Sequence, residues 1–196
     1  MISEQAKQRM HALASYYPIA RSAVMPALHI AQQEEGYITQ EGLQAVAEAI
    51  GITVDDVESV ATFYTMYYQH PQGKRVIKVC TSISCYLRNC DQLVEHLEQR
   101  LGIKRGETTP DGNYTLMIAE CLASCGTAPV IQVNDEFVEN VTPAMADALI
   151  DEIDRELAAR TENVGAQLIA PNQQSTAPNQ QSTAPDYPRV PTSRAQ

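Results

Sequence analysis

The chain has 196 residues and a formal net charge of −10 at pH 7. A chain of this length forms one large domain or two small ones. The acidic balance argues against nucleic acid and anionic lipid as partners, because their phosphates would be repelled by such a surface, and it favours a protein partner or a small cofactor.

The first part of the chain, residues 1–73, is predicted to be a helical domain. Pro18 ends the first helix. Its apolar side chains recur at helical spacing, at Met10, Leu13, Ala14 and Tyr17. Ser22 is predicted to cap the second helix, which ends at Gly36 and has Pro26 in its first turn, where a missing N–H costs least.

Two further helices are predicted from their N-terminal residues. Thr39 opens the third helix, and Gly51 ends it. Thr53, followed three residues later by Asp56, has the spacing of a capping box and opens the fourth helix, which Pro71 closes. The apolar positions of these two helices are Leu43, Val46 and Ile50, then Val57, Val60, Ala61, Tyr64 and Tyr67.

A change of periodicity marks a second domain, residues 74–160. The segment RVIKVC is predicted to be a strand that ends at Cys80, and YTLMIAEC a strand that ends at Cys121. The helix DQLVEHLEQRLG lies between them, and TTPDGN forms a turn.

The rest of this domain is predicted to be a hairpin and a helix. VIQVND and EFVENV pair through Asn134 and Asp135. Thr142 caps the last helix, which runs from Pro143 to Ala159. The order is therefore strand, helix, strand, strand, strand, helix in two layers, and the whole chain is assigned to the α+β class.

The remaining residues, 161–196, have a different composition. They are rich in proline, glutamine and serine, and the heptapeptide APNQQST occurs twice in tandem, at residues 170–176 and 177–183. Such sequence has little apolar surface to bury, so we expect a disordered, solvated tail.

The five cysteines are expected to lie in a reducing compartment. Residues 1–18 lack the apolar core of a signal peptide, and no apolar run approaches the length of a bilayer span. We therefore expect a cytoplasmic protein with no direct membrane insertion. Clustered cysteines in such a protein are more often metal ligands or redox centres than disulfides.

Four of the cysteines form two pairs, each at the end of a predicted strand. The pairs are Cys80 with Cys85, and Cys121 with Cys125. Two adjacent strands could bring both loops to one end of the sheet and so form a single site with four thiolates. Small or hydroxyl-bearing neighbours would let the backbone approach a cluster and donate hydrogen bonds to its sulfurs; they are Thr81, Ser82, Ser84, Ser124 and Gly126.

The fifth cysteine, Cys90, is predicted to be a packing residue and not a ligand. Asn89 and Gln92 have the spacing of an N-cap and its reciprocal partner, so Cys90 would occupy the first helical position. It shares an apolar face with Leu93, Val94, Leu97 and Leu101. A free cysteine commonly behaves as a small hydrophobe in such a place.

The spacing leaves the metal open between structural zinc and an iron–sulfur cluster, because both accept four thiolates at these intervals. A thiol–disulfide enzyme is less favoured, since neither pair has the CxxC spacing. No motif ties any of the four histidines to a cysteine as a catalytic partner. The chain also lacks the glycine patterns of the Rossmann fold and the phosphate-binding loop, which argues against binding of NAD or ATP by those routes.

Several segments together resemble a known family. VCTSISCYLRNC, GIKRGETTPDGNYTL, ECLASCGTAPVIQVND and ENVTP are similar to the small thioredoxin-like iron–sulfur subunit of the NADH-dehydrogenase module of respiratory complex I, the E-subunit family of bacterial NADH-quinone oxidoreductase. YYPIARSAVMPALHIAQQEEGYI and VESVATFYTMYYQHPQGKRVIKVC resemble its helical domain. The likeness covers about residues 10–157. One departure is Asn89, where relatives often have glycine.

This resemblance implies a helical bundle followed by a thioredoxin-like domain that carries one [2Fe–2S] cluster on Cys80, Cys85, Cys121 and Cys125. It also implies one-electron exchange with the flavin (FMN) of an NADH-binding partner subunit, within the peripheral arm of a complex on the cytoplasmic membrane. The family has Cys90 outside its ligand set. The isolated chain is expected not to oxidise NADH, since hydride chemistry belongs to the partner.

Three other hypotheses remain. The same module serves NAD-dependent formate dehydrogenases and NAD-linked or bifurcating hydrogenases, beside a similar flavoprotein. A zinc-stapled interaction module, or a stand-alone thioredoxin-like redox protein, would belong to different classes. Zinc sites are colourless, whereas iron–sulfur clusters absorb visible light.

Overall fold

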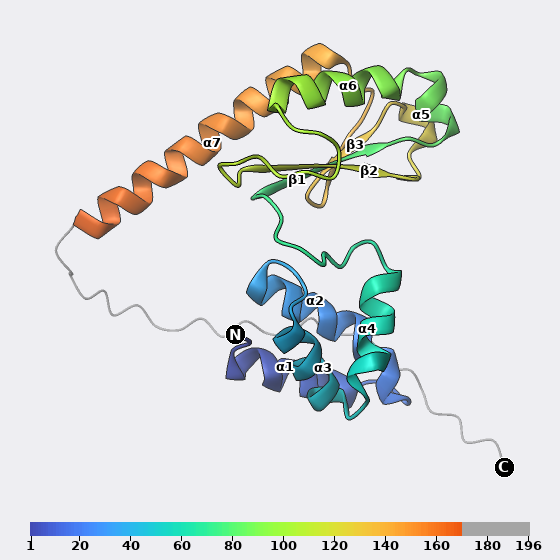
Figure 1. The fold of residues 1–196 in the computed structure, drawn as a ribbon, viewed down its shortest axis with the longest axis vertical. Helices are drawn as coiled ribbons and strands as arrows, with labels where there is room; N and C mark the ends of the chain where they lie inside the picture. The colour runs from blue at the N-terminus through green and yellow to red at the C-terminus, as the bar shows by residue number, and fades with distance from the viewer. Residues whose placement is uncertain (170–196) are drawn as a thin grey trace. The chain divides into compact units, whose positions relative to one another are not determined.

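The computed structural model describes residues 1–169, with side chains up to residue 159. The chain divides into two compact units, Met1–Asp151 and Glu152–Gln196. Figure 1 shows the elements of the chain. The helical part contains α1 (Glu4–Ala14), the 3₁₀ turn η1 (Ala20–Ala23), α2 (Val24–Glu35), α3 (Gln40–Ile50) and α4 (Val54–Phe63). The elements that follow are β1 (Arg75–Cys80), α5 (Ile83–Leu87), α6 (Cys90–Leu101), β2 (Tyr114–Ala119), η2 (Cys125–Thr127), β3 (Ile131–Val133), β4 (Glu136–Val138) and α7 (Pro143–Ile169).

The four helices α1–α4 pack around one apolar core. Its fully buried side chains include Met10, Leu28, Val46 and Val57. Two predicted caps are confirmed: the Thr39 hydroxyl accepts a hydrogen bond from Gly42 N at 2.9 Å, and the Thr53 hydroxyl accepts one from Asp56 N at 3.2 Å. Each satisfies a backbone N–H that has no partner within the helix. Gly36 and Gly51 end α2 and α3 in the left-handed conformation, as predicted.

Three details of the helical prediction are wrong. Ser22 does not cap α2. It lies in η1, and because this turn continues directly into α2, the backbone N–H of Val24 already has a partner in Arg21 O. The first helix ends at Ala14, before Pro18, and leaves Tyr17 38% exposed.

The third error concerns the end of α4, at Phe63 instead of near Pro71. Tertiary hydrogen bonds hold the following segment in a non-helical conformation of turns and bends. The side chain of Gln32 donates to Met66 O at 2.9 Å and accepts from Tyr68 N at 2.7 Å. Tyr67 is still buried, and its hydroxyl donates to Met25 O. These contacts between distant segments take precedence over helical periodicity.

The second half contains a mixed four-stranded sheet with the order β2-β1-β3-β4. β1 is parallel to β2 and antiparallel to β3, and β3 and β4 form the predicted hairpin. The fold class is therefore α+β, as expected. Gly73 precedes β1 at a close approach of two backbones, where a Cβ would lie 2.6 Å from Tyr114 C. Only glycine fits there.

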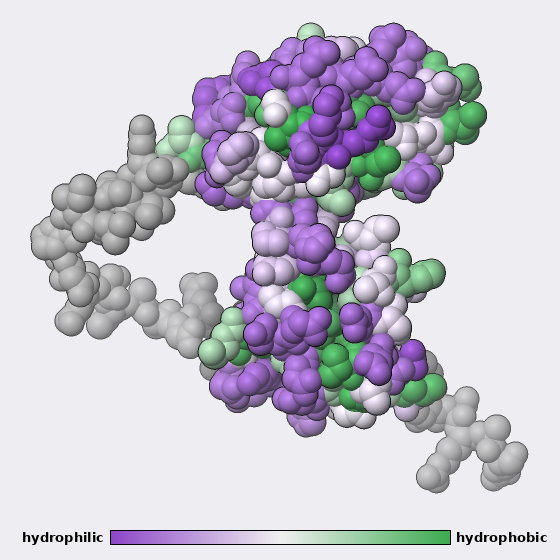
Figure 2. Space-filling view, in the orientation of Figure 1, coloured by the Kyte–Doolittle hydropathy of each residue, from purple (hydrophilic) through white to green (hydrophobic). Residues whose placement is uncertain are grey.

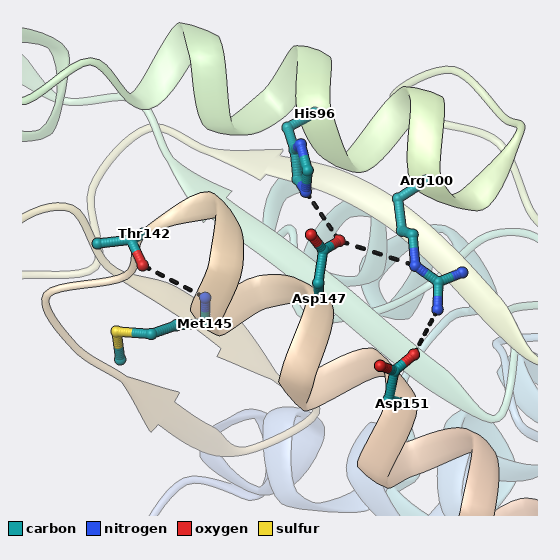
Figure 3. A network of polar contacts seen from close by, with 6 residues as sticks. All are labelled: His96, Arg100, Thr142, Met145, Asp147 and Asp151. Atoms are coloured by element: carbon teal, nitrogen blue, oxygen red, sulfur yellow. Dashed lines mark hydrogen bonds and ion pairs between the residues drawn. The ribbon is translucent and has the colours of Figure 1, made fainter.

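Helix α6 and the first turns of α7 lie side by side and cover the same side of the sheet (Figure 1). Polar contacts join them (Figure 3): His96 Nε2 lies 2.8 Å from Asp147 Oδ1, and the Arg100 guanidinium donates to Asp151 at 2.7 Å. At the start of α7, Thr142 accepts from Met145 N at 3.3 Å, so the predicted cap is confirmed.

Helix α7 continues to Ile169, beyond the predicted end at Ala159. The residues after Ala159 include no proline until Pro171, so nothing in this stretch forces the backbone out of a helix. The predicted boundaries at residues 73 and 160 remain predictions, and the tandem APNQQST repeats lie outside the described residues. Within residues 1–169, every helix falls short of the length or apolar content that a membrane span needs.

Candidate metal centre

The first cysteines of the two pairs lie at the same end of the sheet, because β1 and β2 are parallel neighbours and each cysteine stands at the carboxyl end of its strand. Cys80 is the last residue of β1 and lies opposite Ala119, the last residue of β2. The chain leaving β1 stays attached to its neighbour, since Thr81 N donates to Ala119 O at 2.9 Å. Cys121 follows β2 two residues later. The expected juxtaposition of the two loops is therefore present.

Two of the other predicted ligands lie near Cys80. The thiols of Cys85 and Cys121 are close enough to lower the pKa of Cys80. Cys80 and Cys85 are buried, whereas Cys121 and Cys125 are exposed. Cys85 lies in α5, and Cys125 is the first residue of η2. Short helical elements thus stand where irregular loops were expected.

As they stand, the described side chains do not form a finished metal site. In the part of the chain described, no group of three or more His, Cys, Asp or Glu side chains has the spacing to hold a metal ion. The chemistry of the donor set does fit an iron–sulfur group, which takes four cysteine thiolates. An added Cβ on Gly126, the residue after Cys125, would meet no atom within 4 Å, so the backbone of this loop has open space beside it.

Backbone N–H groups surround the sulfurs and favour their ionised form. Those of Ser82 and Leu122 donate to Cys80, and that of Val130 donates to Cys85. Ala123 N donates to Cys121 Sγ at 3.3 Å. Donors of this kind stabilise thiolate charge and tune a bound cluster.

The two buried thiols differ in acidity. Burial raises the pKa of Cys80, but the N–H groups of Ser82 and Leu122 and the neighbouring thiols outweigh burial, so the pKa lies below its usual value. Burial raises the pKa of Cys85 to about 11; the N–H of Val130 opposes this rise, and the sulfur of Cys80 adds to it. Cys80 is therefore the first of the pair to ionise, and metal binding must remove the proton from Cys85.

The fifth cysteine is buried, as predicted. Cys90 is the first residue of α6 and lies on its buried face with Leu93, Val94 and Leu97. Burial raises the pKa of the Cys90 thiol, with smaller contributions from Asp91 and Cys80. The predicted capping box is wrong, because Asn89 makes no side-chain cap. Asn89 instead adopts the left-handed conformation, with φ of 64°, and its N–H donates to Tyr86 O at the end of α5.

The predicted neighbours of the sulfurs have different environments. Ser82 contributes its backbone N–H to Cys80, and the Thr81 hydroxyl donates to Ala119 O. Ser84 is half-buried in α5. The Ser124 hydroxyl donates to Glu139 Oε1 at 2.6 Å. The expected hydroxyl donation to sulfur therefore does not apply to Ser124 as it lies here.

Sequence inspection missed the backbone donors at Leu122, Ala123 and Val130. Every non-proline residue carries an N–H, so residue identity gives no signal for where such a group points. Helix α5 was also missed, although Ser82 at its N-terminal boundary is a residue type that commonly precedes helices.

Comparison with known proteins identifies the family of the chain. The family model of the thioredoxin-like [2Fe–2S] ferredoxin matches residues 10–154. An E-subunit of the NADH-quinone oxidoreductase of Rhizobium meliloti is 41% identical over 167 residues, which cover 85% of this chain and 98% of that protein. NADH-quinone oxidoreductase subunit 2 of Thermus thermophilus is 47% identical over 131 residues, or 66% of this chain and 72% of that protein.

A solved structure also has the same fold. An NAD⁺-reducing [NiFe]-hydrogenase in the air-oxidised state matches with a TM-score of 0.60 and 22% identity, over 68% of this chain and 23% of that one. The family match covers the helical part, the sheet and all five cysteines. The chain belongs to the thioredoxin-like [2Fe–2S] ferredoxin family, and its relatives include the E-subunits of NADH-quinone oxidoreductases.

Proposed function

We propose that this chain is the electron-transfer subunit of an NADH:quinone oxidoreductase and that Cys80, Cys85, Cys121 and Cys125 hold one [2Fe–2S] cluster. The observation that carries the proposal is the meeting of both cysteine loops at one end of β1 and β2. The family model and the relatives' names support the same assignment.

The residues of this chain would bind the cluster and adjust its charge. Thiolates of the four cysteines bind the irons, and N–H groups of residues 82, 122, 123 and 130 stabilise the sulfur charge. When bound, a [2Fe–2S] cluster accepts and releases one electron at a time. The exposed Cys121 and Cys125 would keep the site close to the surface, where a partner can approach.

The hydride chemistry would belong to a partner. We expect an FMN-bearing, NADH-binding subunit next to this chain, within a peripheral arm on the cytoplasmic side of the membrane. The chain alone is then expected not to oxidise NADH, because it would supply only a one-electron carrier.

Exposed apolar side chains beside the ligands favour α5 as part of the docking surface for that partner. Ile83 is 70% exposed, Tyr86 57% and Leu87 73%, and all three lie in the helix that carries Cys85. Figure 2 shows hydrophobic residues at the end of this domain where α5 lies. A cluster of apolar residues in a mostly hydrophilic surface is typical of an interaction site.

Substitution of Ile83 and Leu87 by serine together is expected to weaken assembly with the flavin-bearing subunit. Loss of two anchors at an interface costs at least about 2 kcal/mol, or roughly thirtyfold in affinity. Co-expression and pull-down of the two subunits, followed by titration of the purified partners, measures this. The iron content of the double variant should equal that of the wild type.

Phe137→Ser is the matched control, because Phe137 is also large, apolar and 51% exposed but lies on β4. It should leave the affinity unchanged. Equal loss of affinity in both variants, or full affinity in the α5 variant, would show that α5 is not part of the interface.

The NAD-linked hydrogenases and formate dehydrogenases remain the second candidate. The match to the hydrogenase supports a common fold at 22% identity, whereas the relatives at 41% and 47% identity are subunits of NADH-quinone oxidoreductases. The subunits that co-purify with this chain from its native membrane fraction distinguish the two assignments.

A further inference from the structure

The loop that carries Cys121 and Cys125 is fastened to the segment between β4 and α7. Asn140 N donates to Thr127 O at 2.7 Å, and Val141 N donates to Pro129 O at 2.9 Å. A side-chain hydrogen bond also joins these two segments: the Ser124 hydroxyl donates to Glu139 Oε1 at 2.6 Å. Ser124 directly precedes Cys125, so this contact fixes a hydroxyl and a carboxylate next to a cysteine ligand.

The Ser124 hydroxyl donates its only hydrogen bond to Glu139. A carboxylate only accepts hydrogen bonds, so the serine must be the donor, and a serine hydroxyl has a single proton. Thr127 Oγ1 lies 2.8 Å from Ser124 Oγ and 3.2 Å from Ser124 O, and these two oxygens and the Glu139 carboxylate are the acceptors within reach of its own proton. Neither hydroxyl is then left to donate to the sulfur of Cys125.

Glu139 carries its negative charge at neutral pH. It is exposed to solvent, and hydrogen bonds from the hydroxyls of Ser124 and Thr127 hold the pKa of its carboxyl below the usual value. A fixed negative charge opposes the addition of an electron nearby. A sulfur without a hydrogen-bond donor also stabilises the reduced form less than one that has a donor.

We propose that Glu139 is a positioning residue that lowers the reduction potential of the cluster, by placing a charge beside Cys125 and by holding the Ser124 hydroxyl away from the sulfur. This inference rests on the cluster assigned to the four cysteines above. Both effects act in the same direction, and substitutions can separate them.

The test is a redox titration of the cluster-loaded full chain, followed by electron paramagnetic resonance. Glu139→Gln keeps an oxygen that can accept from Ser124 but removes the charge, so the midpoint potential should shift upward. Glu139→Ala also frees the serine proton, so its upward shift should be larger. The shift for Glu139→Gln should shrink at high salt, because the carboxylate is exposed.

Two controls make the test specific. Ser124→Ala keeps the charge and removes only a hydroxyl that does not reach the sulfur, so the potential should stay close to that of the wild type. Asp135→Asn removes one charge at the hairpin turn, at the far end of β4 from Glu139, and should shift the potential less than Glu139→Gln.

A potential for Glu139→Gln no higher than that of Asp135→Asn would overturn the proposal. A lower potential for Ser124→Ala would also overturn it, since the hydroxyl would then be donating to the cluster. The iron content of each protein is measured before titration. A wild-type chain without iron would instead refute the assignment of the cluster itself.

Discussion

Replacing Cys121 with serine is expected to strip the chain of most of its iron. The Cys121 thiol is close enough to Cys80 to lower the pKa of that residue, and it receives a hydrogen bond from Ala123 N. A serine hydroxyl stays protonated at neutral pH and binds soft metal centres poorly. Changes to outer-shell partners already cost about 10–100-fold in metal affinity, so loss of a ligand should cost at least that much. Iron and acid-labile sulfide per chain, with the visible spectrum, measure the effect.

Cys90→Ala is the matched control, because Cys90 is also a free cysteine near the predicted ligands: it is buried, and it is close enough to affect the pKa of Cys85. It should keep its full iron content and lose only about 1 kcal/mol of stability from the small cavity. Full iron in the Cys121 variant, or loss of iron in the Cys90 variant, would show that the wrong four cysteines were chosen.

Leu97→Ala is expected to lower the free energy of unfolding by about 2–5 kcal/mol. Leu97 lies on the buried face of α6, the helix that begins at Cys90, and is almost fully buried. Removing its side chain leaves a cavity in the layer between α6 and the sheet. Urea unfolding, followed by circular dichroism and by the visible absorbance of the cluster, measures the loss.

The control for this prediction is on the same helix. Glu95 is exposed, so Glu95→Ala should change the free energy of unfolding by no more than about 0.5 kcal/mol. If the Leu97 and Glu95 variants unfolded at the same urea concentration, α6 would not pack on the sheet in the way described.

The sequence predicted those elements whose signals are local. Thr39 and Thr53 cap their helices because a hydroxyl three residues before an unpaired N–H needs no distant partner. The predictions failed where distant segments decide the conformation. Gln32 holds the chain after α4 in turns and bends, and the tyrosine periodicity beyond Phe63 could not reveal that contact.

A similar division applies to the metal centre. That the two cysteine loops meet follows from parallel pairing of two strands that each end in a cysteine, and this was predictable. The directions in which individual hydrogen-bonding groups point could not be predicted from the sequence. Ser124 has the right residue type and position to donate a hydrogen bond to a sulfur. Its hydroxyl instead donates to the carboxylate of Glu139, a residue on the segment after β4.

The most direct test of the cluster assignment is metal analysis of the anaerobically purified chain, with electron paramagnetic resonance before and after addition of dithionite. We expect two irons per chain, as a [2Fe–2S] family member should contain, and a signal that appears only on reduction. One zinc per chain without iron and without such a signal, in protein made with an ample iron supply, would contradict the assignment and identify a structural zinc module.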